Sequence, residues 1–144
     1  MREPEVARWW GAYDAERVRA DMVEDRETVV YAIEADGELI GVVQYSEEDD
    51  PDYRHAGIDI AVATAWQGRG YGTEALRVVA RHLIEDRGHH RLTIDPSATN
   101  VRAIRAYENV GFRPVGLMRE YERGPDGSWR DGLLMDMLAD ELPP

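Results

Sequence analysis

A glycine-rich segment between a predicted strand and a predicted helix constrains this chain more than any other feature. The segment is QGRGYG, residues 67–72, in which every second residue is glycine. Before it, apolar and other residues alternate over 58–63, which is the period of a β-strand. After it, residues 73–88 carry apolar side chains at steps of three and four and end at a glycine, as an amphipathic helix does. The sequence therefore predicts a strand, a tight loop and a helix in direct succession.

Such a loop is suited to hold a phosphate group. The first turn of a helix has N–H groups without partners inside the helix, its dipole favours anions, and glycines let an anion approach the backbone. Thr73 adds a hydroxyl group near the helix start. Two familiar phosphate loops fit poorly, because the chain has no lysine for a P-loop and its glycine spacing is not G-x-G-x-x-G. The alternative is a tight turn that binds nothing.

Residues 95–112, DPSATNVRAIRAYENVGF, predict a loop followed by a second helix. Asn100 suits the N-cap of this helix, and Gly111 suits the residue that ends it. Asn100, Ala103 and Tyr107 are three and four residues apart, so they share one face. The small side chain of Ala103 would leave a groove between two polar side chains.

Together the two segments resemble the GNAT superfamily of N-acetyltransferases. There a Gln-x-x-Gly-x-Gly loop holds the pyrophosphate of acetyl-CoA, and residues 67–72 have that pattern. A second block, N-x-x-A-x-x-x-Y-x-x-x-G-F, is matched by residues 100–112. The chain is most similar to aminoglycoside 6′-N-acetyltransferases, through VARWW at 6–10, GID at 57–59 and residues 95–112. VARWW also resembles siderophore-type N-acyltransferases, which leaves a siderophore amine open as an acceptor.

The resemblance implies an α/β (α+β) GNAT fold, in which a mixed central sheet has splayed central parallel strands. We expect one domain over residues 1–144, with the order helix, three strands, helix, strand, helix and two strands. The first two strands should form a hairpin around Asp36 and Gly37, and the last two should flank GPDG at 124–127. Members of the superfamily usually begin with a strand, and this chain is expected to lack it. A second copy of the chain could cover the sheet edge left open, which would make a homodimer.

Three residues are expected to carry the chemistry of acetyl transfer, two of them implied by the resemblance and one by its place at the end of a strand. Tyr107 is implied to donate a proton to the thiolate of CoA, for which a phenol with a pKa near 10 is suited. Asp59, carried over from the GID match, is the candidate base that removes a proton from the amine. Asp95 ends the next strand and is expected to bind a cationic amine, although these two carboxylates could exchange roles. The alternatives are a packed aromatic ring, a solvated strand residue and a turn-forming Asp before Pro96.

Further residues are expected to bind the two substrates. The pantetheine amides of acetyl-CoA would pair with the backbone of the strand that precedes the loop. One of Trp9 and Trp10, adjacent on the first helix, is expected to line the acceptor pocket. Arg69, Arg102 and Arg105 are candidate partners of the CoA phosphates. The full set expected to contact acetyl-CoA is Ala61, Val62, Ala63, Gln67, Gly68, Arg69, Gly70, Tyr71, Gly72, Thr73, Asn100, Ala103 and Arg105.

The charge of the chain bears on its partners. The formal net charge is −12, and residues 1–60 contribute −11 of it, with 17 acids against 6 arginines. Nucleic acids and anionic membranes are poor partners for such a surface, whereas a cationic acceptor is a good one. Acidic side chains also keep proteins soluble, so charge alone does not decide. The histidines lack convincing ligand spacing, so no metal is expected.

Several functions remain open at this point. The leading one is acetylation of a primary amine on a small cationic acceptor, most of all an aminoglycoside. Acetylation of a protein N-terminus or lysine, acyl transfer to a siderophore amine, and a CoA-binding domain without turnover are the alternatives. No stretch is apolar enough to span a membrane, and residues 1–10 lack the apolar core of a signal peptide, so a cytoplasmic protein is expected.

Overall fold

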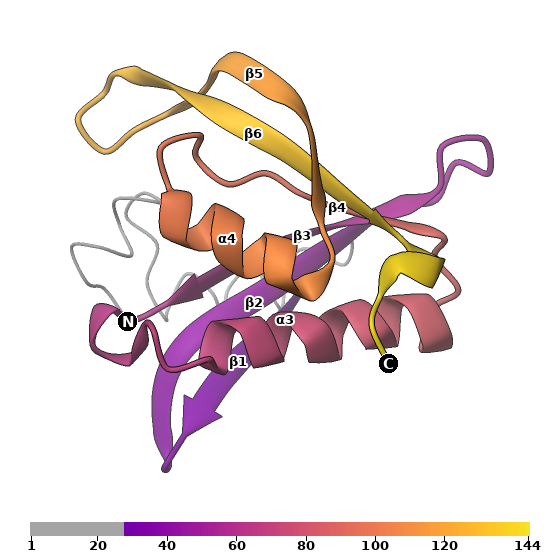
Figure 1. The fold of residues 1–144 in the computed structure, drawn as a ribbon, viewed down its shortest axis with the longest axis horizontal. Helices are drawn as coiled ribbons and strands as arrows, with labels where there is room; N and C mark the ends of the chain where they lie inside the picture. The colour runs from indigo at the N-terminus through magenta and orange to yellow at the C-terminus, as the bar shows by residue number, and fades with distance from the viewer. Residues whose placement is uncertain (1–27) are drawn as a thin grey trace.

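The computed structural model describes residues 28–144. They form a mixed sheet with two α-helices packed on one of its faces (Figure 1). The predicted first helix, the expected absence of a first strand and the edge it would expose lie outside the described residues. The strands are β1 (Thr28–Ala35), β2 (Glu38–Glu48), β3 (His55–Val62), β4 (Arg91–Ile94), β5 (Arg113–Arg123) and β6 (Trp129–Leu138). The helical elements are η1 (Thr64–Trp66), α3 (Tyr71–Arg81), η2 (His82–Asp86), α4 (Val101–Val110) and η3 (Ala139–Glu141).

The six strands have the order β1-β2-β3-β4-β6-β5. Strands β1 and β2 form the predicted hairpin, whose turn has positive φ angles of 52° at Asp36 and 80° at Gly37. Such a turn matches the right-handed twist of the strands it joins, which is why Asp-Gly favours it. All neighbouring strands are antiparallel except β3 and β4. The hairpin prediction and the prediction of a mixed sheet are both confirmed.

The one parallel pair is short, and this opens the sheet. Strand β3 pairs with β4 at residues 56–58 only, opposite 92–94. Beyond Ile58, β3 continues to Val62 beside β2, while β4 ends at Ile94. The two central strands therefore separate at their carboxyl ends, which confirms the predicted splay.

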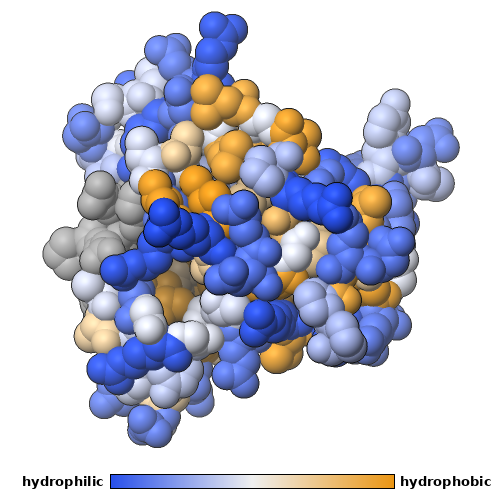
Figure 2. Space-filling view, in the orientation of Figure 1, coloured by the Kyte–Doolittle hydropathy of each residue, from blue (hydrophilic) through white to orange (hydrophobic). Residues whose placement is uncertain are grey.

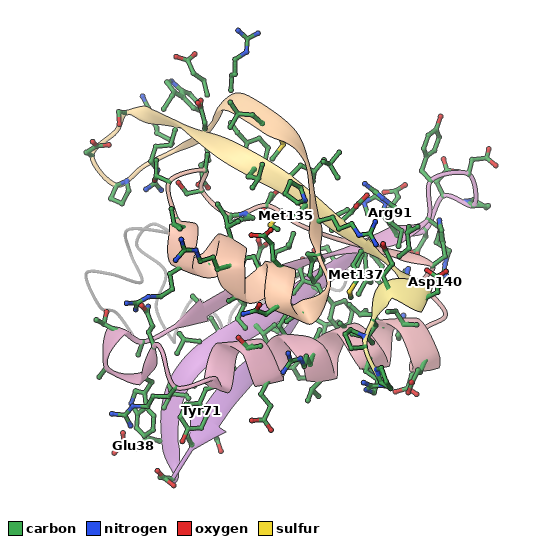
Figure 3. All side chains as sticks on the ribbon, in the orientation of Figure 1. Glu38, Tyr71, Arg91, Met135, Met137 and Asp140 are labelled. Carbon is green, nitrogen blue, oxygen red and sulfur yellow. The ribbon has the colours of Figure 1, made fainter. Side chains whose placement is uncertain are left out.

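The core lies between the sheet and the helices. Helices α3 and α4 lie side by side across one face of the sheet (Figure 1). Met135 and Met137 of β6, labelled in Figure 3, are fully buried in the cluster that joins the sheet to these helices. The largest other fully buried members are Ile40, Ile58, Leu76, Leu83, Leu92 and Phe112.

Two details differ from the expected elements. Helix α3 begins at Tyr71 rather than Thr73, because Gly70 already takes the cap position with a left-handed backbone. The helix ends in a wider turn, η2, before the predicted stop at Gly88.

Strand β5 lies at the sheet edge and is exposed along most of its length. Figure 2 shows apolar side chains gathered over this part of the face in view.

Candidate active site

A cleft of about 820 Å³ opens where β3 and β4 separate. Its walls come from the ends of these strands, the glycine loop with the first turn of α3, helix α4 with the loop before it, and one residue pair at the end of β5. The carboxyl ends of parallel strands are the usual place for ligands in sheets of this kind. The predicted site residues that line the cleft are Asp59, Ala61, Val62, Gln67, Gly68, Gly70, Gly72, Thr73, Asp95, Asn100, Ala103 and Tyr107.

The glycines of the loop serve two different purposes. Gly68 and Gly70 have φ angles of 77° and 88°, and a Cβ atom at either one would meet nothing within 4 Å. These two residues are therefore glycine because of their backbone conformation. Gly72 is different, since a Cβ atom there would lie 3.2 Å from Cγ2 of Val62. It lets the first turn of α3 lie close against β3.

Gln67 ties the loop to both sides of the cleft. Its Nε2 donates a 2.8 Å hydrogen bond to the carbonyl oxygen of Val62, and its Oε1 accepts a 3.1 Å hydrogen bond from Arg102. Because both ends of the amide bind protein, this residue joins the end of β3 to α4. Contact of Gln67 and Arg102 with CoA was predicted from the sequence, but the hydrogen bond between these two residues and the link it makes from β3 to α4 were not predicted.

Four residues expected to contact CoA do not line the cleft: Ala63, Arg69, Tyr71 and Arg105. Ala63 is buried and donates its N–H to Ile40, while Arg105 is exposed on α4. The guanidinium carbon of Arg69 lies 5.0 Å from the ring centre of Trp66. Tyr71 packs edge-on against the same tryptophan, with 5.6 Å between ring centres. Trp66 does line the cleft, so Arg69 and Tyr71 support its wall.

Helix α4 brings Asn100 and Tyr107 to the cleft. The Oδ1 atom of Asn100 accepts a 3.2 Å hydrogen bond from the N–H of Ala103, which confirms the predicted N-cap. Burial raises the pKa of the Tyr107 phenol, and the negative charges of Asp59 and Asp95 raise it further. The phenol therefore keeps its proton at neutral pH and can donate it.

The side chain of Asp59 lines the cleft and is open to solvent there. Burial raises the pKa of its carboxyl group to about 6, and the negative charge of Asp95 adds to this. A 3.5 Å hydrogen bond from Nε2 of Gln44, which pairs with Asp59 across β2 and β3, acts in the opposite direction. At pH 7 this carboxylate is mostly ionised, yet it binds a proton more readily than an ordinary Asp.

Asp95 and Glu122 complete an acidic wall. Burial raises the pKa of Asp95, and a 2.6 Å hydrogen bond from the hydroxyl of Tyr121 opposes that rise. Burial raises the pKa of Glu122 as well, while the charge of Arg130 lowers it. Gln44, Glu122 and Tyr121 were not predicted from the sequence, because no local motif surrounds them. Only the fold brings Gln44 and Glu122 to the cleft and Tyr121 to Asp95.

Three remaining predictions concern the two tryptophans, a metal ion and a membrane span. Trp9 and Trp10 lie outside the described residues. Among residues 28–144, no group of three or more His, Asp or Glu is placed to hold a metal ion. His82 lies 2.8 Å from the carboxylate of Asp86, and His89 lies 2.5 Å from that of Glu47, so both have protein partners away from the cleft. No helix within this part of the chain is long and apolar enough to cross a membrane.

These groups define what the cleft can do. The loop at the start of α3 is suited to phosphates, and the ends of β3 and α4 offer polar backbone beside it. The opposite wall carries three carboxylates that attract a cation, Asp59, Asp95 and Glu122. In the same cleft the carboxyl group of Asp59 has a pKa of about 6, and the phenol of Tyr107 keeps its proton. These functional groups are the ones that transfer of an acyl group from a phosphate-bearing carrier to an amine requires.

Comparisons with known proteins agree with this geometry. The profile of the acetyltransferase (GNAT) family matches residues 2–112. The aminoglycoside N(6′)-acetyltransferase type 1 of Klebsiella pneumoniae is 33% identical over 147 residues, covering 88% of this chain and 70% of that protein. The [ribosomal protein uS5]-alanine N-acetyltransferase of Escherichia coli is 26% identical over 107 residues, covering 74% of this chain and 55% of that protein. Mycobacterium smegmatis RimJ, solved in complex with CoA-disulfide, has 31% identity and a TM-score of 0.78 over 90% of this chain and 61% of that one.

Proposed function

The chain belongs to the GNAT family of acetyltransferases, and we propose that it acetylates a primary amine of a small polycationic acceptor, namely the 6′-amine of an aminoglycoside. The observation that carries this proposal is the meeting of Asp59, Asp95 and Glu122 in one cleft beside the glycine loop. An aminoglycoside carries several ammonium groups. A wall of carboxylates is therefore more complementary to an aminoglycoside than to a peptide. The relative from Klebsiella supports the same acceptor.

The glycine loop and the open edge of β3 would bind acetyl-CoA. In this proposal Gly68, Gly70 and the first turn of α3 receive the pyrophosphate. Residues 60–62 of β3 have no partner on β4, so their backbone is available to the pantetheine amides as a neighbouring strand would be. Acetyl-CoA is a co-substrate, and the donor chemistry is its thioester.

The proposed transfer moves two protons. Asp59 takes a proton from the ammonium group, directly or through a water molecule, and leaves a neutral amine with a lone pair. The amine nitrogen bonds to the acetyl carbon as the carbon–sulfur bond breaks. Tyr107 gives its proton to the leaving thiolate and recovers one, through water, from the acylated nitrogen, which leaves a neutral amide, and Asp59 releases its proton to solvent. Asp95 and Glu122 hold other ammonium groups of the acceptor, and the base role of Asp59 is favoured by its pKa of about 6.

One other acceptor class has support. The relative from Escherichia coli is named for acetylation of an alanine on a ribosomal protein, so a protein N-terminus is the second candidate. An N-terminal peptide presents one ammonium group, which would leave part of the acidic wall unused. We expect the enzyme in the cytoplasm, where acetyl-CoA is available. A domain that binds CoA without turnover would make no use of Asp59 and Tyr107.

A thiol-release assay tests the proposal. The protein is incubated with acetyl-CoA and, separately, with kanamycin A, spermidine, or a peptide with a free N-terminal alanine, and free CoA is measured over time. We expect kanamycin A to give the largest kcat/KM and the product to be acetylated at the 6′-nitrogen by mass spectrometry. Faster turnover of the peptide would replace the aminoglycoside by a protein acceptor. Binding of acetyl-CoA without turnover of any amine would overturn the enzymatic proposal.

A further inference from the structure

Strand β5 carries an irregular segment next to the cleft. Its pairing with β6 runs from Met118 opposite Gly132 directly to Glu122 opposite Arg130. Residues 119–121 of β5 therefore stand opposite a single residue of β6, Asp131, and form a β-bulge. Within it, Glu120 has a φ angle of 48°, a left-handed conformation that is strained for a residue with a side chain.

The bulge changes where two neighbouring side chains point. In a regular strand, successive side chains face opposite sides of the sheet. Here Tyr121 and Glu122 are adjacent, yet both reach the acidic wall. The hydroxyl of Tyr121 donates a 2.6 Å hydrogen bond to Asp95, and Glu122 lines the cleft and adds its negative charge to the field at Asp59.

Asp131 holds this arrangement from the opposite strand. Its Oδ1 atom accepts a 2.8 Å hydrogen bond from the N–H of Glu120, the strained residue of the bulge. Its backbone oxygen accepts a 2.9 Å hydrogen bond from Ala98, in the loop that follows Asp95. One residue thus links the bulge to the loop beside the cleft.

The neighbour of Asp131 makes room for the same arrangement. A Cβ atom at Gly132 would lie 2.9 Å from Cδ2 of Tyr121, so the tyrosine ring rests against backbone that bears no side chain. The hydrogen bond from Glu120 to Asp131 and the contact between the Tyr121 ring and Gly132 both depend on the side of the sheet to which the bulge turns Tyr121. Both contacts favour the orientation in which the hydroxyl of Tyr121 reaches Asp95.

We propose that Asp131 is a positioning residue that sets acceptor specificity: by holding the bulge at Glu120, it keeps Tyr121 and Glu122 against the acidic wall that binds a polycationic amine. This inference rests on the proposed function, because the proposed function names the polycationic amine that the acidic wall binds. Asp131 itself does not line the cleft, and it acts through Tyr121, Glu122 and, beyond them, Asp95.

Two substitutions at Asp131 test the role of its oxygen. In Asp131→Ala the N–H of Glu120 loses its acceptor, and we expect the KM for kanamycin A to rise about tenfold, the scale of one lost hydrogen bond. The KM for acetyl-CoA should stay within about twofold, because the glycine loop lies on another wall. Asp131→Asn keeps an oxygen that can accept the same bond, so it should restore most of the acceptor affinity.

A matched control lies in the same hairpin. Asp126 also uses Oδ1 to accept a backbone N–H, that of Ser128 at 3.0 Å, but it stands in the exposed turn between β5 and β6. If Asp131 served only to stabilise the hairpin, Asp126→Ala and Asp131→Ala would have similar kinetics. We expect Asp126→Ala to behave like the wild type. In a Tyr121→Phe, Glu122→Gln background, Asp131→Ala should raise the acceptor KM much less, because the groups it positions are already altered.

A measurement without turnover separates this inference from the proposed function. The pKa of Asp95 is followed by NMR in protein labelled with ¹³C at its aspartate carboxyl groups. Asp131→Ala and Tyr121→Phe should both raise that pKa, because the hydrogen bond from Tyr121 holds it down, and Asp126→Ala should not. An unchanged Asp95 pKa, or an unchanged acceptor KM in an active enzyme, overturns the inference. If the wild type acetylates no amine, the proposed function fails, and the NMR result still decides whether Asp131 positions Tyr121.

Discussion

Asp59 and Asp95 occupy equivalent positions on two neighbouring parallel strands, each directly after the last residue at which β3 and β4 pair. The strands separate from that point, so both carboxylates face the cleft that the separation opens. The negative charge of Asp95 contributes to the raised pKa of Asp59, after burial. The splay therefore makes room for a ligand and creates the acid–base properties of the site in the same step.

The first prediction concerns the glycine loop. Gly70→Asp should weaken acetyl-CoA binding at least about tenfold by calorimetry, because a carboxylate would stand where the start of α3 attracts phosphate. Gly37→Asp is the matched control, since Gly37 also has a positive φ and open space around a Cβ atom but lies in the β1–β2 turn. Equal affinity of the two variants for acetyl-CoA would rule out the loop as the phosphate site.

The second prediction concerns the proton donor. Tyr107→Phe should lower kcat by about 10²-fold with little change in acetyl-CoA affinity, because the ring still packs and only the proton is lost. Steady-state kinetics and calorimetry on the same preparation check this. Tyr53→Phe, at a tyrosine that is 73% exposed, is the control and should be fully active. Full activity of Tyr107→Phe would reduce this residue to a packing role.

The third prediction is a pH profile. If Asp59 is the base, kcat/KM for the acceptor should rise with pH through about 6, because only the ionised carboxylate can accept a proton. The groups that act on Asp59 are Gln44 from β2, Asp95 after β4 and Glu122 from β5. Asp59→Asn should lose this limb and should lower kcat at pH 7. The decrease in kcat caused by Asp59→Asn should become smaller at high pH, because more of the acceptor is then already a free amine. A limb near pH 6 that persists in the Asn variant would assign it to another group.

The fourth prediction is thermodynamic and follows from the same raised pKa. Between about pH 4, the unfolded value, and pH 6, the folded protein holds a proton on Asp59 that the unfolded chain releases. Stability of the wild type should therefore fall as pH rises through this window, and Asp59→Asn should not share that loss. At pH 7 we expect the variant to be more stable by about 1 kcal/mol, reduced from the full shift because the carboxylate is open to solvent in the cleft. Thermal unfolding of the wild type and of Asp59→Asn at pH 4 and pH 7 measures this difference in stability. An equal difference between the two proteins at both pH values would contradict the prediction.

The fifth prediction separates acceptor binding from chemistry. Asp95→Asn should raise the acceptor KM more than it lowers kcat, as expected for lost ground-state binding. Increasing salt should lower the acceptor kcat/KM, because ions screen charges over about 8–10 Å at 0.1–0.15 M, and should affect the KM for acetyl-CoA less. Asp52→Asn removes the same charge from an exposed loop and is the control. If salt has no effect and both variants match the wild type, the acidic wall does not recruit the acceptor.

Local patterns determined the elements and the family. Alternation marked β3, Asp36-Gly37 marked the first hairpin, and Asn100 marked the start of α4, since each depends on forces between residues close in the chain. The QGRGYG motif located the loop, and the positive φ angles at Gly68 and Gly70 account for its glycines. Asp59, Asp95 and Tyr107 were expected in one site, and the cleft contains all three.

Only the tertiary structure decided the rest of the site. Nothing near Gln67 in the chain shows that its amide is held between Val62 and Arg102, and no motif directs Tyr121 toward Asp95. Sequence reasoning works on residues a few positions apart, whereas these contacts join segments separated by up to 35 residues. The pKa of Asp59 is likewise a property of the cleft, because burial and charges from other strands set it. The sequence by itself thus determined which residues are able to do the chemistry, and the tertiary structure decided which of them meet and in what electrostatic environment.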